Sequence, residues 1–291
     1  MQVFLENEQL KVTINTFGGE LAGIVKKQTG VEYMWNADEK YWKRTSPVLF
    51  PIVGSLKNKE FIYEGKSYPM GQHGFARDMD FSIKSREAGT VWFSLKADEE
   101  TLKKYPFVFC LELGYRLEGN KLKVLWRVTN EDEKEMYFSI GGHPAFMCPL
   151  NGEGKQTDYY IAFDTKEDLT YSVLDKNGLV DIEGEVLSTE DGMLPIRKDL
   201  FDRDALIIEG KQAKKVSLCD RDKKPYLSVS FDSPLFGLWS PAGKHAPFIC
   251  IEPWYGRCDK ASFGGTLEER EYGNVLKPGE VFEKEYQIEI L

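Results

Sequence analysis

Residues 108–130 read VFCLELGYRLEGNKLKVLWRVTN, and this stretch sets the class of the fold. From Tyr115 to Val128, side chains that can face a core alternate with polar ones on both sides of Gly119 and Asn120. Alternation with a period of two is typical of a β-strand, and a glycine–asparagine pair between two such runs is typical of a hairpin turn. We therefore predict a long antiparallel hairpin.

Strand-like runs continue along most of the chain, at spacings of roughly ten residues. They lie at 3–5, 10–14, 21–26, 79–85, 90–97, 205–210, 215–222, 226–233, 235–241, 247–254 and 282–290, with a second hairpin in 57–69. A helix is expected only at 99–105, and a short helical turn at 39–44. Residues 151–191 are expected to be peripheral. The pattern predicts an all-β, mostly antiparallel sandwich or barrel with few short helices, formed by residues 1–291 as a single domain.

The composition favours a small neutral ligand. The chain is 42% hydrophobic, which allows a sizeable core, and its formal net charge of −9 is unfavourable for nucleic acid or an anionic membrane surface. The N-terminal residues alternate and carry early acids, unlike a signal peptide, and no stretch has the length of a membrane span. Five cysteines without a CxxC pair indicate reduced thiols in a cytoplasmic protein.

The first candidate for acid–base chemistry is His143, in the segment GGHPAF. This segment follows an alternating run, so His143 is expected at a strand end where Gly141, Gly142 and Pro144 hold the backbone close. A histidine held in the core by hydrogen bonds is the alternative. The third histidine, His245 in AGKHAPF, is expected to be exposed and without a role.

A second candidate segment is HGFARD, which contains His73 and Arg77. Gly74 and the nearby Gly71 give the backbone freedom to project the imidazole of His73 into a cleft. The guanidinium of Arg77 can donate paired hydrogen bonds to ligand hydroxyls or to a phosphate. Alternatively, Arg77 and Asp78 form an exposed ion pair that contributes little.

The third candidate segment is PFICIEPWYG, residues 247–256. A period of two places Glu252 on the same strand face as Cys250, so Cys250 either lines the site or is a packing residue. Burial among apolar groups would raise the pKa of Glu252 toward the range of a general base, and Trp254 offers an aromatic face to a ligand. The alternative is a structural carboxylate bound to backbone N–H groups or to Arg257. By contrast, the charged residues 268–270 are expected to be solvated.

Several other chemistries lack their sequence signature. The trio of His73, His143 and Glu252 could form a long-range metal site, but the chain lacks the close HxD or HxE pair that often serves such sites. There is also no GxSxG segment, no phosphate-binding P-loop and no dinucleotide-binding glycine pattern. These absences argue against serine hydrolases, NTPases and dehydrogenases.

Taken together, the motifs resemble one known family. The segments SPVLFPIVG (46–54), HGFARDMDF (73–81), YPFVFCLELGYRLEGNKLKV (105–124), IGGHPAF (140–146) and PFICIEPWYG (247–256) occur in this order over nearly the whole chain. They resemble the aldose 1-epimerase (mutarotase) family, especially its LacX-like branch. The resemblance implies a β-supersandwich of the galactose mutarotase type, and interconversion of the α and β anomers of an aldose without cofactor or metal.

Carried over residue by residue, the resemblance assigns roles to the candidates. Glu252 would be the general base at the anomeric hydroxyl, and His143 the general acid at the ring oxygen. His73 would hold and polarise the sugar. Asp204 in FDRDALII matches a hydroxyl-binding aspartate, with Asp202 as the competing choice.

One departure from the family pattern concerns the substrate. Many galactose mutarotases have an arginine upstream of the first histidine, where this chain has GSLK, so Lys57 or Arg77 would replace it. A neighbouring branch acts on hexose 6-phosphates, so the aldohexose is expected to be free or phosphorylated. The rival functions are a non-catalytic sugar-binding protein on the same fold and a glycosidase or lyase that uses two carboxylates. The expected assembly is a monomer or a homodimer.

Overall fold

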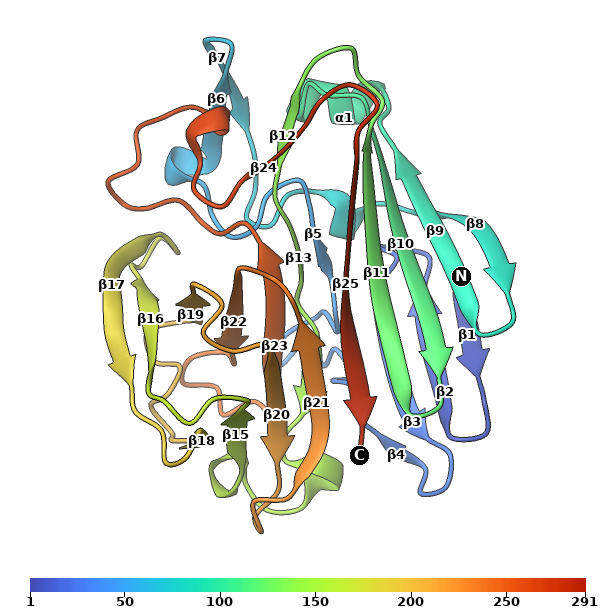
Figure 1. The fold of residues 1–291 in the computed structure, drawn as a ribbon, viewed down its shortest axis with the longest axis vertical. Helices are drawn as coiled ribbons and strands as arrows, with labels where there is room; N and C mark the ends of the chain where they lie inside the picture. The colour runs from blue at the N-terminus through green and yellow to red at the C-terminus, as the bar shows by residue number, and fades with distance from the viewer.

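A computed structural model describes residues 1–291, and two large antiparallel sheets dominate it (Figure 1). The nine-stranded sheet has the order β18 (Met193–Pro195), β15 (Tyr160–Phe163), β20 (Lys215–Cys219), β21 (Pro225–Phe231), β25 (Val281–Ile290), β11 (Lys121–Asn130), β10 (Phe109–Glu118), β9 (Thr90–Lys96) and β8 (Ser82–Glu87). The eight-stranded sheet has the order β17 (Val180–Leu187), β16 (Leu169–Leu174), β19 (Leu206–Glu209), β22 (Leu235–Trp239), β23 (Phe248–Tyr255), β13 (Ile140–Gly142) and β5 (Val48–Leu49), and β14 (Ala145–Met147) also pairs with β23.

Smaller elements complete the chain. An N-terminal sheet contains β1 (Gln2–Glu6), β2 (Leu10–Asn15), β3 (Leu21–Lys26) and β4 (Val31–Glu32); the two short pairs are β6 (Glu60–Tyr63) with β7 (Lys66–Pro69), and β12 (Met136–Phe138) with β24 (Asn274–Leu276). The only α-helix is α1 (Glu99–Lys104), where Asp98 and Thr101 form a capping box. Residues 38–42 form the expected short helical turn, in which the backbone N–H groups of Tyr41 and Trp42 both donate to the backbone oxygen of Asp38, and no helix continues beyond it. No helix has the length and apolar character needed to cross a membrane.

The predicted hairpin is confirmed as β10 and β11. The two strands pair from Glu118↔Lys121 beside the turn to Phe109↔Asn130 at the far end. Gly119 has a φ of +56°, in the region that favours glycine, which explains its place in the turn. These strands and β25 are the longest in the molecule and form the middle of their sheet (Figure 1).

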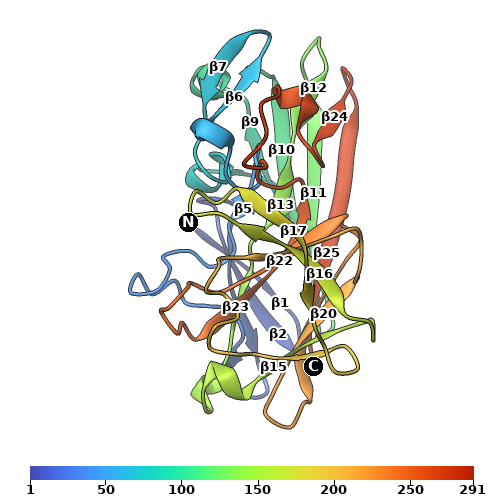
Figure 2. The same ribbon diagram turned by 90° about the vertical axis from the view of Figure 1, so that its left-hand side faces the viewer.

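The two large sheets pack face to face. The ring of Trp126 on β11 lies 6.2 Å from that of Tyr255 on β23, and the ring of Phe231 on β21 lies 5.1 Å from that of Phe236 on β22. A continuous core of 67 buried residues fills the space between and around the sheets. Figure 2 shows β16 and β17 toward the viewer, with β10 and β11 behind them. The all-β, mostly antiparallel sandwich predicted from the sequence is therefore confirmed.

The middle segment is more integrated than expected. β15 and β18 extend one large sheet, β16 and β17 extend the other, and Ile161 and Leu169 are fully or almost fully buried. The prediction that residues 151–191 are peripheral holds for their position at the sheet edges but not for their packing. Shorter strands at an edge still bury the side chains on their inner face.

Arg270 corrects another expectation, because it is buried rather than solvated. Its Nε donates to Oδ1 of Asp259 at 2.7 Å, and the two side chains are 3% and 4% exposed. Arg270 also donates to the backbone oxygen of Arg257 and to the hydroxyl of Ser139. The short run of charges therefore has a structural ion pair at its end, which fastens residues 257–270 to the sandwich.

We expect Arg270→Leu to lower the free energy of unfolding by about 3–5 kcal/mol, because it leaves the buried carboxylate of Asp259 without a counter-charge. Urea unfolding followed by tryptophan fluorescence measures the loss. The neighbouring exposed variant Glu268→Gln should change stability by less than about 0.5 kcal/mol. Arg270→Leu combined with Asp259→Asn should lose less than Arg270→Leu alone, and an equal or greater loss would contradict the assignment.

Candidate active site

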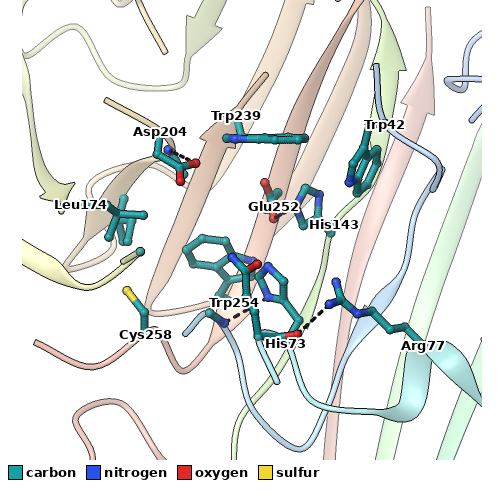
Figure 3. Close-up of a pocket in the computed structure, with 15 residues that line it drawn as sticks. Trp42, His73, Arg77, His143, Leu174, Asp204, Trp239, Glu252, Trp254 and Cys258 are labelled. Carbon is teal, nitrogen blue, oxygen red and sulfur yellow. Dashed lines mark hydrogen bonds and ion pairs between the residues drawn. The ribbon is translucent and has the colours of Figure 1, made fainter. Parts of the chain in front are cut away.

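A cavity of about 210 Å³ opens on the eight-stranded sheet and collects most of the predicted site residues. Its lining residues are Trp42, Gly54, Gln72, His73, Arg77, His143, Leu174, Gly178, Asp204, Ala205, Ile207, Trp239, Glu252, Trp254 and Cys258. Figure 3 shows Glu252 and His143 near the centre, between the side chains of Trp42 and Trp239 and those of Trp254 and His73. Segments far apart in the sequence therefore converge on one small space.

Strand pairing places His143 opposite Glu252. On one side of His143, Ile140 pairs with Tyr255 on β23, and on the other side Ala145 pairs with Cys250. Both runs follow the same antiparallel register, so position 143 falls opposite position 252. Opposite residues of an antiparallel pair project from the same face, which brings the imidazole and the carboxylate together.

Two glycines make room for the indole of Trp254. A Cβ atom at Gly141 would lie 2.5 Å from the indole, and one at Gly237 would lie 2.7 Å from it. Both distances are too short for real atoms, so side chains at these positions would displace the ring. The indole lies across the neighbouring strands β13 and β22, and its face forms a wall of the cavity.

His143 is enclosed by aromatic rings. Trp42 stacks on the imidazole with ring centroids 4.7 Å apart, and Trp239 meets it edge-on at 5.3 Å. Only 6% of the residue is exposed. Burial, reinforced by the positive charge of Arg77, lowers the pKa of His143 to about 3, because both disfavour the imidazolium.

Glu252 lies beside His143 and lacks a fixed ionic partner. Its Oε2 is 3.3 Å from Nε2 of His143, and the residue is 1% exposed. Burial raises the pKa of Glu252 well above its usual range, and the charge of Asp204 raises it further. Arg257, the alternative partner considered from the sequence, instead pairs with Glu183, Glu209 and Glu271.

The pair can share one proton. With the proton on His143 the pair is a carboxylate and an imidazolium, and with the proton on Glu252 both groups are neutral. Burial disfavours the charged form of each group, so the pKa of the base is raised and that of the acid is lowered. Such a pair is suited to giving and taking protons within a single ligand.

The backbone of Gly54 fixes the protonation pattern of His73. The backbone N–H of Gly54 donates to Nδ1 of the His73 ring at 3.1 Å, and the backbone N–H of His73 donates to the backbone oxygen of Gly54 at 2.9 Å. An accepting Nδ1 carries no proton, so the neutral ring bears its proton on Nε2. Burial, together with the charge of His143, lowers the pKa of His73 well below its usual range. His73 is therefore a neutral hydrogen-bond donor beside the pair.

Arg77 contributes a positive charge at the edge of the cavity. Its Nη2 donates to the backbone oxygen of Gln72 at 2.7 Å. Burial lowers the pKa of Arg77 to about 10, so the group remains charged at neutral pH. Asp78 lies 3.9 Å from Arg77 and makes a shorter 2.8 Å contact with Arg44. The alternative of an exposed pair between Arg77 and Asp78 is therefore the weaker description.

The structure separates the two candidate aspartates and removes Lys57 from the cavity. Both side chains are exposed, but Asp204 lines the cavity and Asp202 lies outside it. Lys57 lines a different cavity, where its backbone N–H donates to Asp259 at 2.9 Å. Lys57 is thus a correction to the sequence-based set, because the turn at residues 57–59 directs it away from His143. Arg77 is the cation that reaches this cavity.

Sequence reasoning missed part of the cavity wall. Trp42 and Trp239 line the cavity and contact His143, whereas a lone tryptophan in a sequence is as readily a packing residue. Their positions beside turns were the only feature of the sequence that could have indicated a place in the site. Leu174 and Gly178 come from the middle segment and had no signal at all.

Unpartnered polar atoms concentrate at this cavity. Seven buried side-chain polar atoms lack a regular hydrogen bond, and two of these, Arg257 Nε and Glu209 Oε1, form an ion pair with each other at 2.5 Å. Four of the other five belong to the cavity residues Arg77, His143, Glu252 and Trp254. Buried polar groups are normally hydrogen-bonded, so this concentration indicates a place for a polar ligand. The metal trio considered from the sequence does not form as expected: the potential ligand atoms that lie within 4.8 Å of one another are those of His143, Cys250 and Glu252.

Comparisons with known proteins find matches over nearly the whole chain. The profile of the aldose 1-epimerase family matches residues 1–289. The chromosomal LacX protein of Lactococcus lactis is 36% identical over 300 residues, which cover 100% of both chains. A galactose mutarotase-related enzyme from Lactobacillus acidophilus superposes with a TM-score of 0.94 at 36% identity, covering 100% of this chain and 97% of that one. A galactose mutarotase-like protein from Lactobacillus casei gives 0.92 at 31% identity, with 100% of both chains covered.

We expect Glu252→Gln to be more stable than the wild type at neutral pH, with the difference shrinking as the pH falls toward the ordinary carboxyl pKa of 4.5. A folded-state pKa above this value means that the wild type loses stability as the pH rises between the two values. The slope of the difference is at most about 1.4 kcal/mol per pH unit. Stability lost at low pH through the lowered pKa of His143 affects both proteins and largely cancels.

Chemical unfolding at a series of pH values, in buffers that contain a chelator, measures this difference. The matched control is Glu112→Gln, since Glu112 is 3% exposed but pairs with Lys84 and Arg127. Loss of these charge contacts should destabilise that variant at neutral pH, which is the opposite sign. A Glu252→Gln protein less stable than the wild type at every pH would contradict the expected burial cost.

Proposed function

The chain belongs to the aldose 1-epimerase family, and from this premise we propose that it interconverts the α and β anomers of an aldohexose by acid–base ring opening. Family membership supports an isomerase or epimerase. The observation that carries the finer proposal is the 3.3 Å approach of Glu252 Oε2 to His143 Nε2 inside a small ligand cavity. The proposed reaction needs no cofactor, because its steps are proton transfers, cleavage and re-formation of the bond between C1 and the ring oxygen, and a bond rotation.

The size and walls of the cavity support a monosaccharide substrate. About 210 Å³ is less than the roughly 300–1,000 Å³ of sites for drug-sized ligands. The indole of Trp254 suits the apolar face of a sugar ring, and Nε2–H of His73 is available to a sugar oxygen. Arg77 is matched by the opposite charge of Asp204, which favours a neutral hexose over a phosphorylated one. A panel of free and phosphorylated aldoses tests this preference.

In the proposed mechanism, the two groups act on the two oxygen atoms of one hemiacetal, the C1 hydroxyl and the ring oxygen. Glu252 takes the proton from the anomeric C1 hydroxyl while His143, as imidazolium, gives a proton to the ring oxygen. The bond between C1 and the ring oxygen breaks, and an open-chain aldehyde forms. Rotation about the C1–C2 bond presents the other face of the carbonyl. Closure then reverses both proton transfers and produces the other anomer.

Burial supports each half of this cycle. Ring opening converts the carboxylate and imidazolium into a neutral acid and a neutral imidazole, so it discharges a buried pair of charges. The raised pKa of Glu252 makes its carboxylate a stronger base, and the lowered pKa of His143 makes its imidazolium a stronger acid. His73 stays neutral because its pKa is lowered by burial, so it can donate a hydrogen bond without titrating at neutral pH.

We expect Glu252→Gln and His143→Gln each to reduce kcat for anomer exchange by about 10²–10⁴-fold, the usual contribution of one acid or base. Polarimetry or exchange NMR with freshly dissolved α-glucose and α-galactose measures the rate. Controls are Glu112→Gln, a buried carboxylate outside the cavity, and His245→Asn, an exposed histidine that does not line it. Full activity in Glu252→Gln would end the assignment. Sugar binding by a wild type whose exchange matches buffer would instead favour the non-catalytic sugar-binding function.

The two aspartates provide a second, matched pair of variants. We expect Asp204→Asn to lower kcat/KM by about 10–100-fold, because a hydrogen bond to a charged group contributes about 1.5–3 kcal/mol. Asp202→Asn should behave like the wild type because Asp202 is exposed outside the cavity. Initial rates over a range of sugar concentrations give both constants. Equal effects of the two substitutions would remove Asp204 from the site.

A further inference from the structure

Three ligand-bearing side chains meet beneath the proposed sugar site. Single donor atoms of His143, Cys250 and Glu252 all lie within 4.8 Å of one another, and all three residues are buried. Cys250 and Glu252 are two residues apart on β23, so they project from the same face of the strand, and His143 lies opposite Glu252. Oε2 of Glu252 has no hydrogen-bond partner in the protein and is 3.3 Å from Nε2 of His143.

We propose that His143, Cys250 and Glu252 form a binding site for a zinc-like divalent cation, and that the cation excludes the sugar. The inhibitory part rests on the proposed function, whereas cation binding does not. The ion would act here as an inhibitor rather than as a cofactor. Nitrogen, thiolate and carboxylate donors are the set that Zn²⁺ accepts, and three protein ligands leave its fourth position open.

The distances fit tetrahedral coordination. Zinc lies about 2.0–2.2 Å from nitrogen and oxygen ligands, which places two such ligands about 3.4 Å apart at the tetrahedral angle. The observed separation of His143 Nε2 and Glu252 Oε2 is 3.3 Å. A thiolate at about 2.3 Å from the ion would lie about 3.6 Å from the other two ligands. The distances from the Cys250 sulfur to the other two ligand atoms, which are at most 4.8 Å, therefore have to shorten by at most about 1.2 Å.

The charges also fit a divalent ion. Binding exchanges the thiol proton of Cys250, and the proton shared by Glu252 and His143, for the cation, and both protons leave to solvent. The thiolate and the carboxylate then neutralise the two positive charges, which avoids a net charge in a buried site. Asp204 adds a favourable negative charge from the cavity wall, opposite to that of Arg77.

The open position explains why the ion and the sugar would compete. Glu252 and His143 line the cavity, so an ion between them faces the space assigned to the sugar. Coordination occupies the lone pair of His143 and the carboxylate oxygen that would exchange protons with the substrate. Metal-bound protein should therefore have neither the base nor the acid available.

Cobalt titration of the purified, chelator-treated chain tests the site without reference to activity. We expect one Co²⁺ per chain, with a thiolate-to-cobalt charge-transfer band and the visible bands of tetrahedral cobalt. Zinc should displace the cobalt, and calorimetry gives its stoichiometry and affinity. Cys250→Ala should abolish the charge-transfer band and weaken zinc binding at least about tenfold, since even loss of a supporting group around a metal costs about 10–100-fold. No cobalt band in the wild type would overturn the proposal.

Matched cysteine variants identify the ligand. Cys219→Ala, a buried cysteine on the other large sheet, should retain the band and the affinity. Cys258→Ala should also retain them, and a band lost only in this variant would overturn the assignment to Cys250, because Cys258 lines the same cavity. Cys250→Ser preserves the side-chain volume and separates ligand loss from misfolding. A wild-type band that persists in Cys250→Ser would likewise overturn the assignment.

Anomer exchange with and without zinc completes the test. Zinc should raise the apparent KM of the wild type and have at least a tenfold weaker effect on Cys250→Ala, each measured relative to the same protein without zinc. A cobalt band without anomer exchange would support the cation site while contradicting the proposed function. Anomer exchange without a cobalt band would support the proposed function and contradict the cation site.

Discussion

The burial of a carboxylate against an imidazole, with no permanent ionic partner for either, is the constraint on which the rest of this structure depends. Glu252 is 1% exposed and His143 6% exposed. Each group alone would be costly in its charged form, and the pair becomes tolerable because it can share one proton. The surrounding strands must hold the two groups together, since free side chains would move apart or recruit water. Position, rather than residue type alone, creates the acid–base pair.

A second buried charge, that of Arg257, lies near the same strand, and it has ionic partners where Glu252 has none. Arg257 lies two residues beyond the end of β23, and its guanidinium pairs with Glu183, Glu209 and Glu271. A cation surrounded by carboxylates is stabilised and chemically quiet. Glu252, five positions earlier, has no cation against its carboxylate and remains able to exchange protons. Arg257 is thus paired with three other carboxylates, and Glu252 faces the cavity without a cation against it.

The sequence predicts the strands better than it predicts the surroundings of single charges. Period-two alternation identified the hairpin and correctly placed Glu252 among apolar neighbours, because a strand has only two faces. The burial of Arg270 was missed, since a short charged run is normally solvated and only the fold brings Asp259 to it. Asp202 and Asp204 could not be told apart for a related reason: they lie in an irregular turn, where spacing does not determine direction.

Strand order explains why three separate motifs work together. β5, from SPVLFPIVG, pairs with β13 at the start of GGHPAF, and β13 pairs with β23 of PFICIEPW. The motifs are thus neighbouring strands of one sheet rather than loops that meet by chance. HGFARD joins them because His73 exchanges two hydrogen bonds with Gly54, just beyond β5. Backbone ladders fix distances far better than flexible loops can, and proton transfer requires such fixed distances. The sandwich therefore serves the proposed chemistry through its central pairing register, which sets 143 opposite 252.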